Sequence, residues 1–210
     1  MVDLNNVSES LQRGDAEKVE ELVKKALEEN LLPKDILENG LIKGMDIIGA
    51  KFKKNEVYVP EVLIAARAMH AGMNILRPKL AETGVKNIGT VAIGTVKGDL
   101  HDIGKNLVKM MLEGAGFEVI DLGIDVSVDK FVEAITEYQP NVLGMSALLT
   151  TTMIQMQEVI KAISDAGLRD KVKIMFGGAP ITQNYADQIG ADGYSPDASS
   201  AVDKAKAFLN

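Results

Sequence analysis

Residues 89–121 read GTVAIGTVKGDLHDIGKNLVKMMLEGAGFEVID, and this stretch decides the fold. Residues 89–95 and 117–121 are short runs rich in valine and isoleucine, which is typical of buried strands. Between them, apolar residues recur at helical spacing: Ile103, Leu107, Val108, Met111 and Leu112. A strand, an amphipathic helix and a second strand in this order indicate a parallel sheet covered by helices.

The same alternation continues toward the C-terminus. Apolar runs at residues 142–145, 172–176 and 191–194 predict three more strands, each separated from the next by a helix. Five such strands indicate an α/β doubly wound domain of the flavodoxin-like type, which we place at residues 87–210. Ligands of these sheets bind at the carboxyl ends of the strands, so the residues directly after each strand form the candidate site.

Residues 1–86 have helical periodicity alone and predict a separate all-α bundle of about four helices. Asp15 is a predicted N-cap, and the helix after it has an apolar stripe made of Val19, Leu22, Val23, Ala26 and Leu27. Pro33 and Pro60 suit the first turns of the next two helices. Residues 53–59 are predicted to form an exposed loop, and residues 82–87 the linker between the domains.

Composition narrows the classes of function. The net charge of −7 argues against a nucleic-acid partner, which would need a basic face. The absence of cysteine excludes disulfides, iron–sulfur clusters, thiolate zinc sites and cysteine nucleophiles. No apolar run approaches the roughly 20 residues that span a bilayer, and residues 1–11 lack a signal-peptide pattern. We therefore expect a cytoplasmic protein with no nucleic-acid and no membrane partner.

Three short motifs follow predicted strands in the C-terminal half. They are Gly98-Asp99-Leu100-His101-Asp102-Ile103-Gly104, then Ser146-Ala147-Leu148, then Gly177-Gly178. In this order they resemble the signature of the cobalamin-binding domain of methionine synthase and of the small methyltransferase corrinoid proteins. The helical half resembles the cap domain of that family, so the resemblance covers nearly the whole chain. It implies cobalamin or a related corrinoid, such as methylcobalamin, as the cofactor, with cobalt as its metal.

Within this resemblance, His101 is the expected axial ligand to cobalt. A neutral imidazole is a good ligand for a borderline transition metal. Asp99 can accept the proton of the other imidazole nitrogen, which fixes the tautomer and raises the basicity of the ligand. The resemblance extends this pair into a relay through Thr152, although Thr150 and Thr151 directly precede it.

The resemblance also implies how the cofactor is held. Ser146 would hydrogen-bond the nucleotide tail of the corrinoid, and Thr150 would approach the edge of the corrin ring. Leu148, from the same motif as Ser146, is also expected to contact the cofactor. Tyr58, from the helical half, would shield the upper face of cobalt. Glycines at three positions permit close backbone approach: Gly104, Gly177 and Gly178. The macrocycle or its side chains would contact Gly98, Asp99, Leu100, His101, Asp102 and Ala198.

The resemblance implies a methyl carrier that is not catalytic alone. A substrate-specific methyltransferase would load cobalt with a methyl group, and an acceptor methyltransferase would pass that group to tetrahydrofolate or a thiol coenzyme. A reductive activase is the third expected partner. Methanol, methylamines, betaines and methoxylated aromatics all remain open as methyl donors.

Other interpretations of the same residues are simpler. A cobalamin-dependent sensor or regulator also pairs a helical bundle with this domain, and the small subunit of an adenosylcobalamin mutase shares the domain without the bundle. Taken alone, His101 could be a surface loop histidine and Gly177-Gly178 a plain strand-to-helix turn. His70, the other histidine, is interpreted as a residue of a helix surface.

Overall fold

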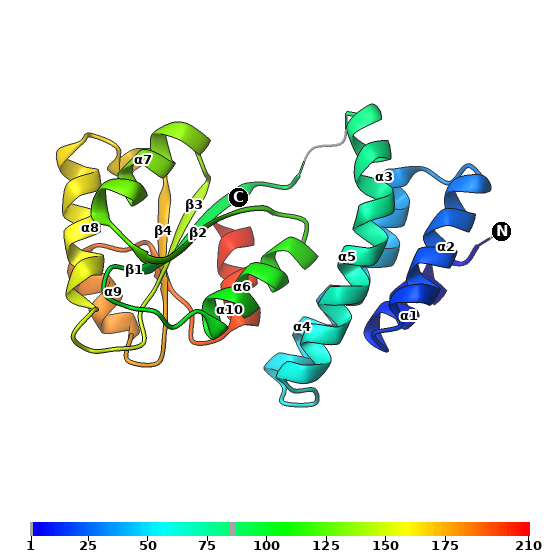
Figure 1. Ribbon diagram of the computed structural model, residues 1–210, viewed down its shortest axis with the longest axis horizontal. Coiled ribbons are helices and arrows are strands. Elements are labelled where there is room, and N and C mark those ends of the chain that lie inside the picture. The colour runs from blue at the N-terminus through cyan, green and yellow to red at the C-terminus, as the bar shows by residue number, and fades with distance from the viewer. Residues whose placement is uncertain (1, 85–86) are drawn as a thin grey trace. The chain divides into compact units, whose positions relative to one another are not determined.

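The computed structural model describes residues 2–84 and 87–210. The chain divides into two compact units, one formed mainly by residues up to 87 and the other mainly by residues from 88 onward. The linker was predicted at residues 82–87, and positions 85 and 86 of that segment lie outside the described residues. One unit contains helices α1 to α5, and the other contains the strands and helices α6 to α10 (Figure 1).

The first unit is helical, as predicted. Asp15 accepts a hydrogen bond from the Lys18 backbone N–H at 3.0 Å and so is the N-cap of its helix. That helix buries most of its apolar stripe. The helical segments are α1 (Leu4–Gln12), α2 (Ala16–Glu28), α3 (Pro33–Ile36), the π-helical segment η1 (Leu37–Ile42), α4 (Lys43–Lys53) and α5 (Val59–Glu82).

The helix predicted after Pro33 is interrupted by the π-helical segment η1. A π turn contains one more residue than an α turn, so it rotates the residues that follow it around the helix axis. Ile36, Leu41 and Ile48 are buried, whereas Leu37 is half-buried. The apolar spacing predicted the helix correctly, but a spacing pattern does not reveal a single wide turn.

Tyr58 directly precedes α5. Its backbone N–H donates to Glu61 Oε2 at 3.0 Å, which satisfies one of the free donors at the start of the helix. The side chain of Tyr58 is 64% exposed. Residues 53–56 are exposed, as predicted for the loop between these two helices.

The second unit is a five-stranded parallel sheet in the order β2-β1-β3-β4-β5, which is the flavodoxin-like order predicted from the sequence. Its strands are β1 (Thr90–Val96), β2 (Glu118–Val126), β3 (Val142–Ser146), β4 (Lys173–Gly177) and β5 (Gly193–Tyr194). Its helices are α6 (Ile103–Gly114), α7 (Val128–Tyr138), α8 (Ile154–Asp165), the short 3-10 helix η2 (Arg169–Lys171), α9 (Gln183–Ile189) and α10 (Ala198–Ala207).

Two strands differ in length from the prediction by more than one residue. β2 continues past Asp121 to Val126, and its pairing with β1 shifts register twice, between Ile93 and Gly94 and between Gly94 and Val96. β5 is shorter, because the Ala191 N–H closes the end of α9 on the Ala186 carbonyl at 2.9 Å instead of joining the sheet. The extra residues in β2 place the Asp125 side chain beside the loop that follows β1.

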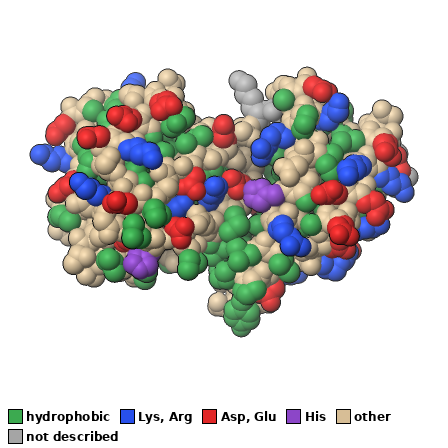
Figure 2. Space-filling model, viewed as in Figure 1, with side chains coloured by type: hydrophobic (Ala, Val, Ile, Leu, Met, Phe, Trp, Pro, Cys, Tyr) green, Lys and Arg blue, Asp and Glu red, His purple; other side chains and the backbone are tan. Residues whose placement is uncertain are grey.

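Helices cover both faces of the sheet: α7, α8 and α9 lie on one face, and α6 and α10 lie on the other (Figure 1). Phe131 of α7 is fully buried over Gly94, where a Cβ would lie 3.0 Å from the ring. Basic and acidic side chains are mixed on the face drawn in Figure 2. Within the part of the chain that the structure describes, no helix has the length and apolar character needed to cross a bilayer.

Candidate functional site

The candidate site is built on the loop between β1 and α6, at the carboxyl end of β1, which lies between β2 and β3 in the sheet. This loop has no regular secondary structure from Asp99 to Asp102. It turns at Gly98, whose φ of +80° favours glycine, and the Asp99 N–H donates back to the Val96 carbonyl at 3.1 Å. Asp99 is fully buried, while the side chain of His101 remains 50% exposed. The loop thus places the buried Asp99 carboxylate next to a half-exposed imidazole.

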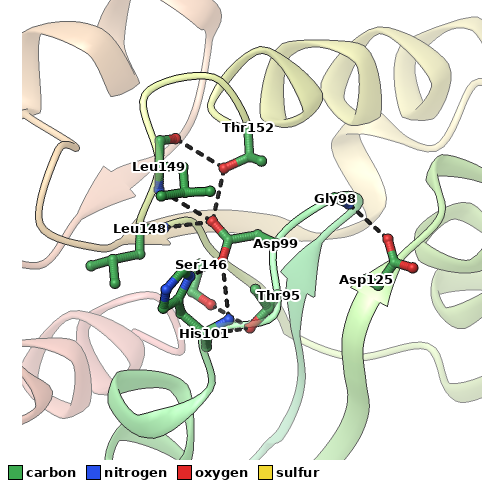
Figure 3. Close-up of polar contacts among 9 residues, drawn as sticks. All are labelled: Thr95, Gly98, Asp99, His101, Asp125, Ser146, Leu148, Leu149 and Thr152. Atoms are coloured by element: carbon green, nitrogen blue, oxygen red, sulfur yellow. Dashed lines mark hydrogen bonds and ion pairs between the residues drawn. The ribbon is translucent and has the colours of Figure 1, made fainter.

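Asp99 and His101 are hydrogen-bonded to each other (Figure 3). The distance from His101 Nδ1 to Asp99 Oδ1 is 2.7 Å, and the His101 backbone N–H donates to the same oxygen at 3.1 Å. An ionised carboxylate can only accept, so the proton of the neutral imidazole resides on Nδ1. The lone pair of Nε2 is therefore free to bind a metal.

The second oxygen of Asp99 is held by three donors from the segment after β3. Oδ2 accepts from the backbone N–H groups of Leu148 at 2.8 Å and Leu149 at 3.2 Å, and from Thr152 Oγ1 at 2.8 Å. Thr152 is buried, whereas Thr150 and Thr151 are exposed. Of these three consecutive threonines, Thr152 is the one whose hydroxyl contacts the carboxylate.

These contacts determine the charge of Asp99. Burial alone raises the pKa of this carboxyl, but the hydrogen bonds from Leu148, His101 and Thr152 outweigh it and hold the pKa well below its usual range. Asp99 is therefore ionised at neutral pH. This charge state supports the assignment of the His101 proton to Nδ1.

Thr95 joins the site although the sequence argument missed it. It is fully buried in β1, and its Oγ1 donates to the His101 carbonyl at 3.1 Å. Ser146 Oγ, at the end of β3, lies 2.8 Å from Thr95 Oγ1. A hydroxyl has one proton, so while Thr95 donates to His101, Ser146 donates to Thr95. The only available signal was a hydroxyl residue near the end of an otherwise apolar strand.

Asp125 also joins the site, and the predicted end of its strand at Asp121 had left it out. Its Oδ1 accepts from the Gly98 N–H at 2.7 Å, and its own N–H donates to the Asp99 carbonyl at 3.1 Å (Figure 3). Residues 122–126 read LGIDV, in which Asp125 and Gly123 interrupt the apolar residues. No sequence signal placed it beside the loop.

Lys105 fixes the other end of the loop. Its side chain is 2% exposed, and its Nζ lies 2.6 Å from Asp121 Oδ1 and 2.8 Å from Asn106 Oδ1. Burial raises the pKa of Asp121, but the bonds from Lys105, the Gly123 N–H and Lys109 outweigh it, so the pKa is lowered. This ion pair ties the start of α6 to β2.

The three predicted glycines have different surroundings. At Gly178, φ is +130° and a Cβ would lie 1.9 Å from the Ala147 carbonyl oxygen, so the fold itself requires glycine. A Cβ at Gly177 would lie 3.7 Å from the Ser195 carbonyl oxygen, an ordinary contact. No atom lies within 4 Å of a Cβ built on Gly104, so open space adjoins that position.

Exposed apolar side chains flank His101. Leu100 and Ile103 lie on the same loop and at the start of α6, and Leu148 and Leu149 follow β3. Their exposed fractions are 65%, 81%, 44% and 42%. Apolar groups left open beside a free imidazole nitrogen suit a flat, largely apolar ligand that carries a metal.

The remaining predicted residues are placed as follows. Asp102 is half-buried and accepts from Asn106 Nδ2 at 3.0 Å. Ala198 is buried at the start of α10, after the N-cap Asp197. Tyr58 belongs to the helical unit. The contacts predicted between these residues and a cofactor remain predictions.

Comparison with known proteins identifies the family. Two family models match, both described as a B12 binding domain, over residues 4–77 and 89–203. The chain is 45% identical to the trimethylamine corrinoid protein of Methanosarcina barkeri, over 96% of this chain and 94% of that protein. The chain belongs to the corrinoid protein family. Its cofactor is cobalamin or a related corrinoid.

Two further proteins resemble this corrinoid protein. The dimethylamine corrinoid protein 1 of Methanosarcina mazei is 49% identical over 84% of this chain and 82% of its own length. The crystal structure of the methanol:cobalamin methyltransferase complex from Methanosarcina barkeri matches with a TM-score of 0.87 at 29% identity, over 98% of this chain and 79% of that chain. The predicted family and fold are thereby confirmed.

The site of this corrinoid protein fits such a cofactor. His101 offers a free Nε2, its Nδ1 proton is held by a buried carboxylate, and apolar side chains lie open on either side. Hydrogen bonding of the second ring nitrogen to a carboxylate is the usual arrangement of a metal-ligating histidine. The chemistry of the donor and its surroundings is thus suited to one axial bond to a metal already held by a macrocycle.

Proposed function

We propose that this corrinoid protein is a methyl carrier, with His101 as the axial ligand to cobalt and Asp99 and Thr152 as its supporting relay. The observation that carries the proposal is the short Asp99–His101 hydrogen bond, which leaves Nε2 unprotonated on a half-exposed side chain. When bound, the corrinoid supplies a cobalt ion that can accept and release a methyl group. The chain itself supplies the ligand, its tautomer and the apolar surroundings.

The relay acts on one proton. Asp99 holds the His101 Nδ1 proton, and the Thr152 hydroxyl and two backbone N–H groups hold Asp99. We propose that the relay would keep this proton on Nδ1, so that Nε2 would be available to the cobalt of a bound corrinoid.

The methyl donor that we propose is a methylated amine, delivered by a separate methyltransferase. Relatives named for trimethylamine and dimethylamine are 45% and 49% identical to this chain, whereas the structure named for methanol is 29% identical. The acceptor methyltransferase and the reductive activase remain proposals that rest on the family resemblance alone.

Electron paramagnetic resonance tests the ligand. The protein loaded with cob(II)alamin is expected to show a nitrogen triplet that becomes a doublet when its histidines carry ¹⁵N. His101→Ala is expected to retain the corrinoid but lose this splitting. The matched control is His70→Ala, because His70 on α5 is the other histidine in the chain. A splitting that ¹⁵N-histidine does not change would contradict the assignment.

Methyl transfer tests the carrier. The reduced holoprotein is expected to be methylated at least about a thousandfold faster with a methylamine methyltransferase and its amine than with the amine alone, because docking orients both reactants. The absorption spectrum of the corrinoid reports each transfer. Methyl transfer that occurs with a methanol methyltransferase but not with a methylamine methyltransferase would refute the amine donor. A light-driven change in oligomeric state without any methyl transfer would favour a sensor.

A further inference from the structure

The end of β2 has an unusual backbone beside the His101 loop. Four described non-glycine residues have positive φ, and three of them, Asn30, Asn55 and Gln139, lie at helix C-termini, where that conformation is common. The fourth, Asp125, has a φ of +51° within a strand. The first of two register shifts between β1 and β2 comes just before Asp125, and the second, between Gly123 and Val126, spans it. Bulges of this kind re-aim side chains next to functional sites.

Asp125 is aimed at the His101 loop. Its Oδ1 accepts from the Gly98 N–H at 2.7 Å, and its backbone N–H donates to the Asp99 carbonyl at 3.1 Å (Figure 3). The two bonds hold the loop backbone on both sides of the Gly98–Asp99 peptide bond. Gly98 is the flexible turn of this loop, with a φ of +80°. Asp125 therefore fixes the position where the chain would otherwise move most easily.

The rest of the loop is held by separate contacts. Thr95 holds the His101 carbonyl at 3.1 Å, and the segment after β3 holds the Asp99 carboxylate. These contacts fix the Asp99 side chain and the far end of the loop, whereas Asp125 fixes the backbone that enters it. Without the Asp125 carboxylate, the Gly98 N–H loses its acceptor and the loop can pivot there.

We propose that Asp125 is a positioning residue, which holds the loop backbone so that His101 presents Nε2 at the place where cobalt binds. The inference rests on the proposed ligand role of His101. A positioning role for Asp125 differs from a purely structural role in one respect. The effect of Asp125 on corrinoid affinity must then depend on the presence of His101.

Three variants separate the contributions of Asp125. Asp125→Gly removes the carboxylate but permits the left-handed backbone, so it does not introduce strain. Asp125→Asn keeps a carbonyl acceptor and tolerates the same backbone. Gln139→Gly is the control, because Gln139 also has positive φ in this domain, at the end of α7.

The apoprotein gives the first readout. Hydrogen exchange of the Gly98 amide, followed by NMR, is expected to be about tenfold faster in Asp125→Gly, which corresponds to the loss of one hydrogen bond. Asp125→Asn is expected to restore most of the protection, and Gln139→Gly to leave it unchanged. Unaltered exchange at Gly98 in Asp125→Gly would overturn the proposed contact.

A double-mutant cycle on corrinoid affinity gives the second readout. With His101 present, Asp125→Gly is expected to raise the Kd for cob(II)alamin about tenfold. In the His101→Ala background, the same substitution is expected to change the Kd less than twofold. Equal weakening in both backgrounds would mean that Asp125 acts on the fold or on the macrocycle, and the inference would be wrong. Absence of the histidine-derived splitting in the wild-type protein would instead reject the ligand role itself.

Discussion

Replacement of Gly178 by alanine is expected to destabilise the protein by about 4 kcal/mol or more. A Cβ at this position would lie 1.9 Å from the Ala147 carbonyl oxygen and 3.0 Å from its carbonyl carbon. Both atoms belong to the backbone, so no side chain can move away to relieve the overlap. The φ of +130° adds strain, because side-chain-bearing residues rarely adopt it. Urea denaturation of the apoprotein, followed by circular dichroism, measures the loss.

Gly190→Ala is the control for Gly178→Ala. Gly190 also has a positive φ, +84°, but no atom lies within 4 Å of a Cβ built there. Backbone strain alone is expected to cost about 1 kcal/mol. If the Gly178→Ala protein is as stable as the Gly190→Ala protein, a Cβ at position 178 does not clash with Ala147 and the prediction fails.

Gly178 changes how the Gly177-Gly178 motif is interpreted. The family resemblance implied close approach of the backbone to a cofactor at this motif, with a plain strand-to-helix turn as the alternative. Gly178 has a sufficient local cause, since the chain cannot pass Ala147 with a side chain at that position. Gly104 has no such cause, because a Cβ there would meet open space. Of the two positions, Gly178 is thus explained by the fold of the chain itself, and a contact of Gly104 with the cofactor stays a prediction.

The sequence was sufficient to predict the sheet, because buried parallel strands are apolar along their whole length. It failed at the end of β2, where Asp121 and Asp125 interrupt the apolar residues. Asp121 ends the apolar run, yet β2 continues to Val126 through two register shifts that bring Asp125 to the loop. Bulges depend on pairing with β1, so residues of β2 alone do not reveal them.

The residues of the candidate site, like the strands, were predicted only in part. Spacing and order pointed to Asp99 and His101, whose contact is local in the chain. Thr95 was missed because a single hydroxyl residue in an apolar strand is indistinguishable from a core residue in the sequence. Its partners, His101 and Ser146, come from two different segments of the chain. Likewise, the choice of Thr152 among three threonines depends on how the chain turns after β3.

Replacement of Asp99 by alanine is expected to destabilise the apoprotein by about 3 kcal/mol. The substitution removes the acceptor of the Leu148 and Leu149 N–H groups and of the His101 N–H. Thr152 loses one of two acceptors, since its hydroxyl also lies 2.9 Å from the Leu149 carbonyl. Thr152→Val, which removes a single donor from the same carboxylate, is therefore the control and is expected to cost about 1 kcal/mol.

Asp99→Asn separates this structural role from the effect on the ligand. Three donors converge on Oδ2, so the amide oxygen of asparagine is expected to take that place and its NH₂ group to face His101. An NH₂ group can only donate, so His101 Nδ1 must become the acceptor and the proton must move to Nε2. Replacing the aspartate of a serine-protease triad by asparagine gives its histidine the wrong tautomer for the same reason. The ¹⁵N chemical shifts of the His101 ring report this exchange in the apoprotein, and the cobalt(II) nitrogen splitting should weaken with it. A folded Asp99→Asn protein whose His101 keeps its proton on Nδ1 would show that Asp99 does not set the tautomer.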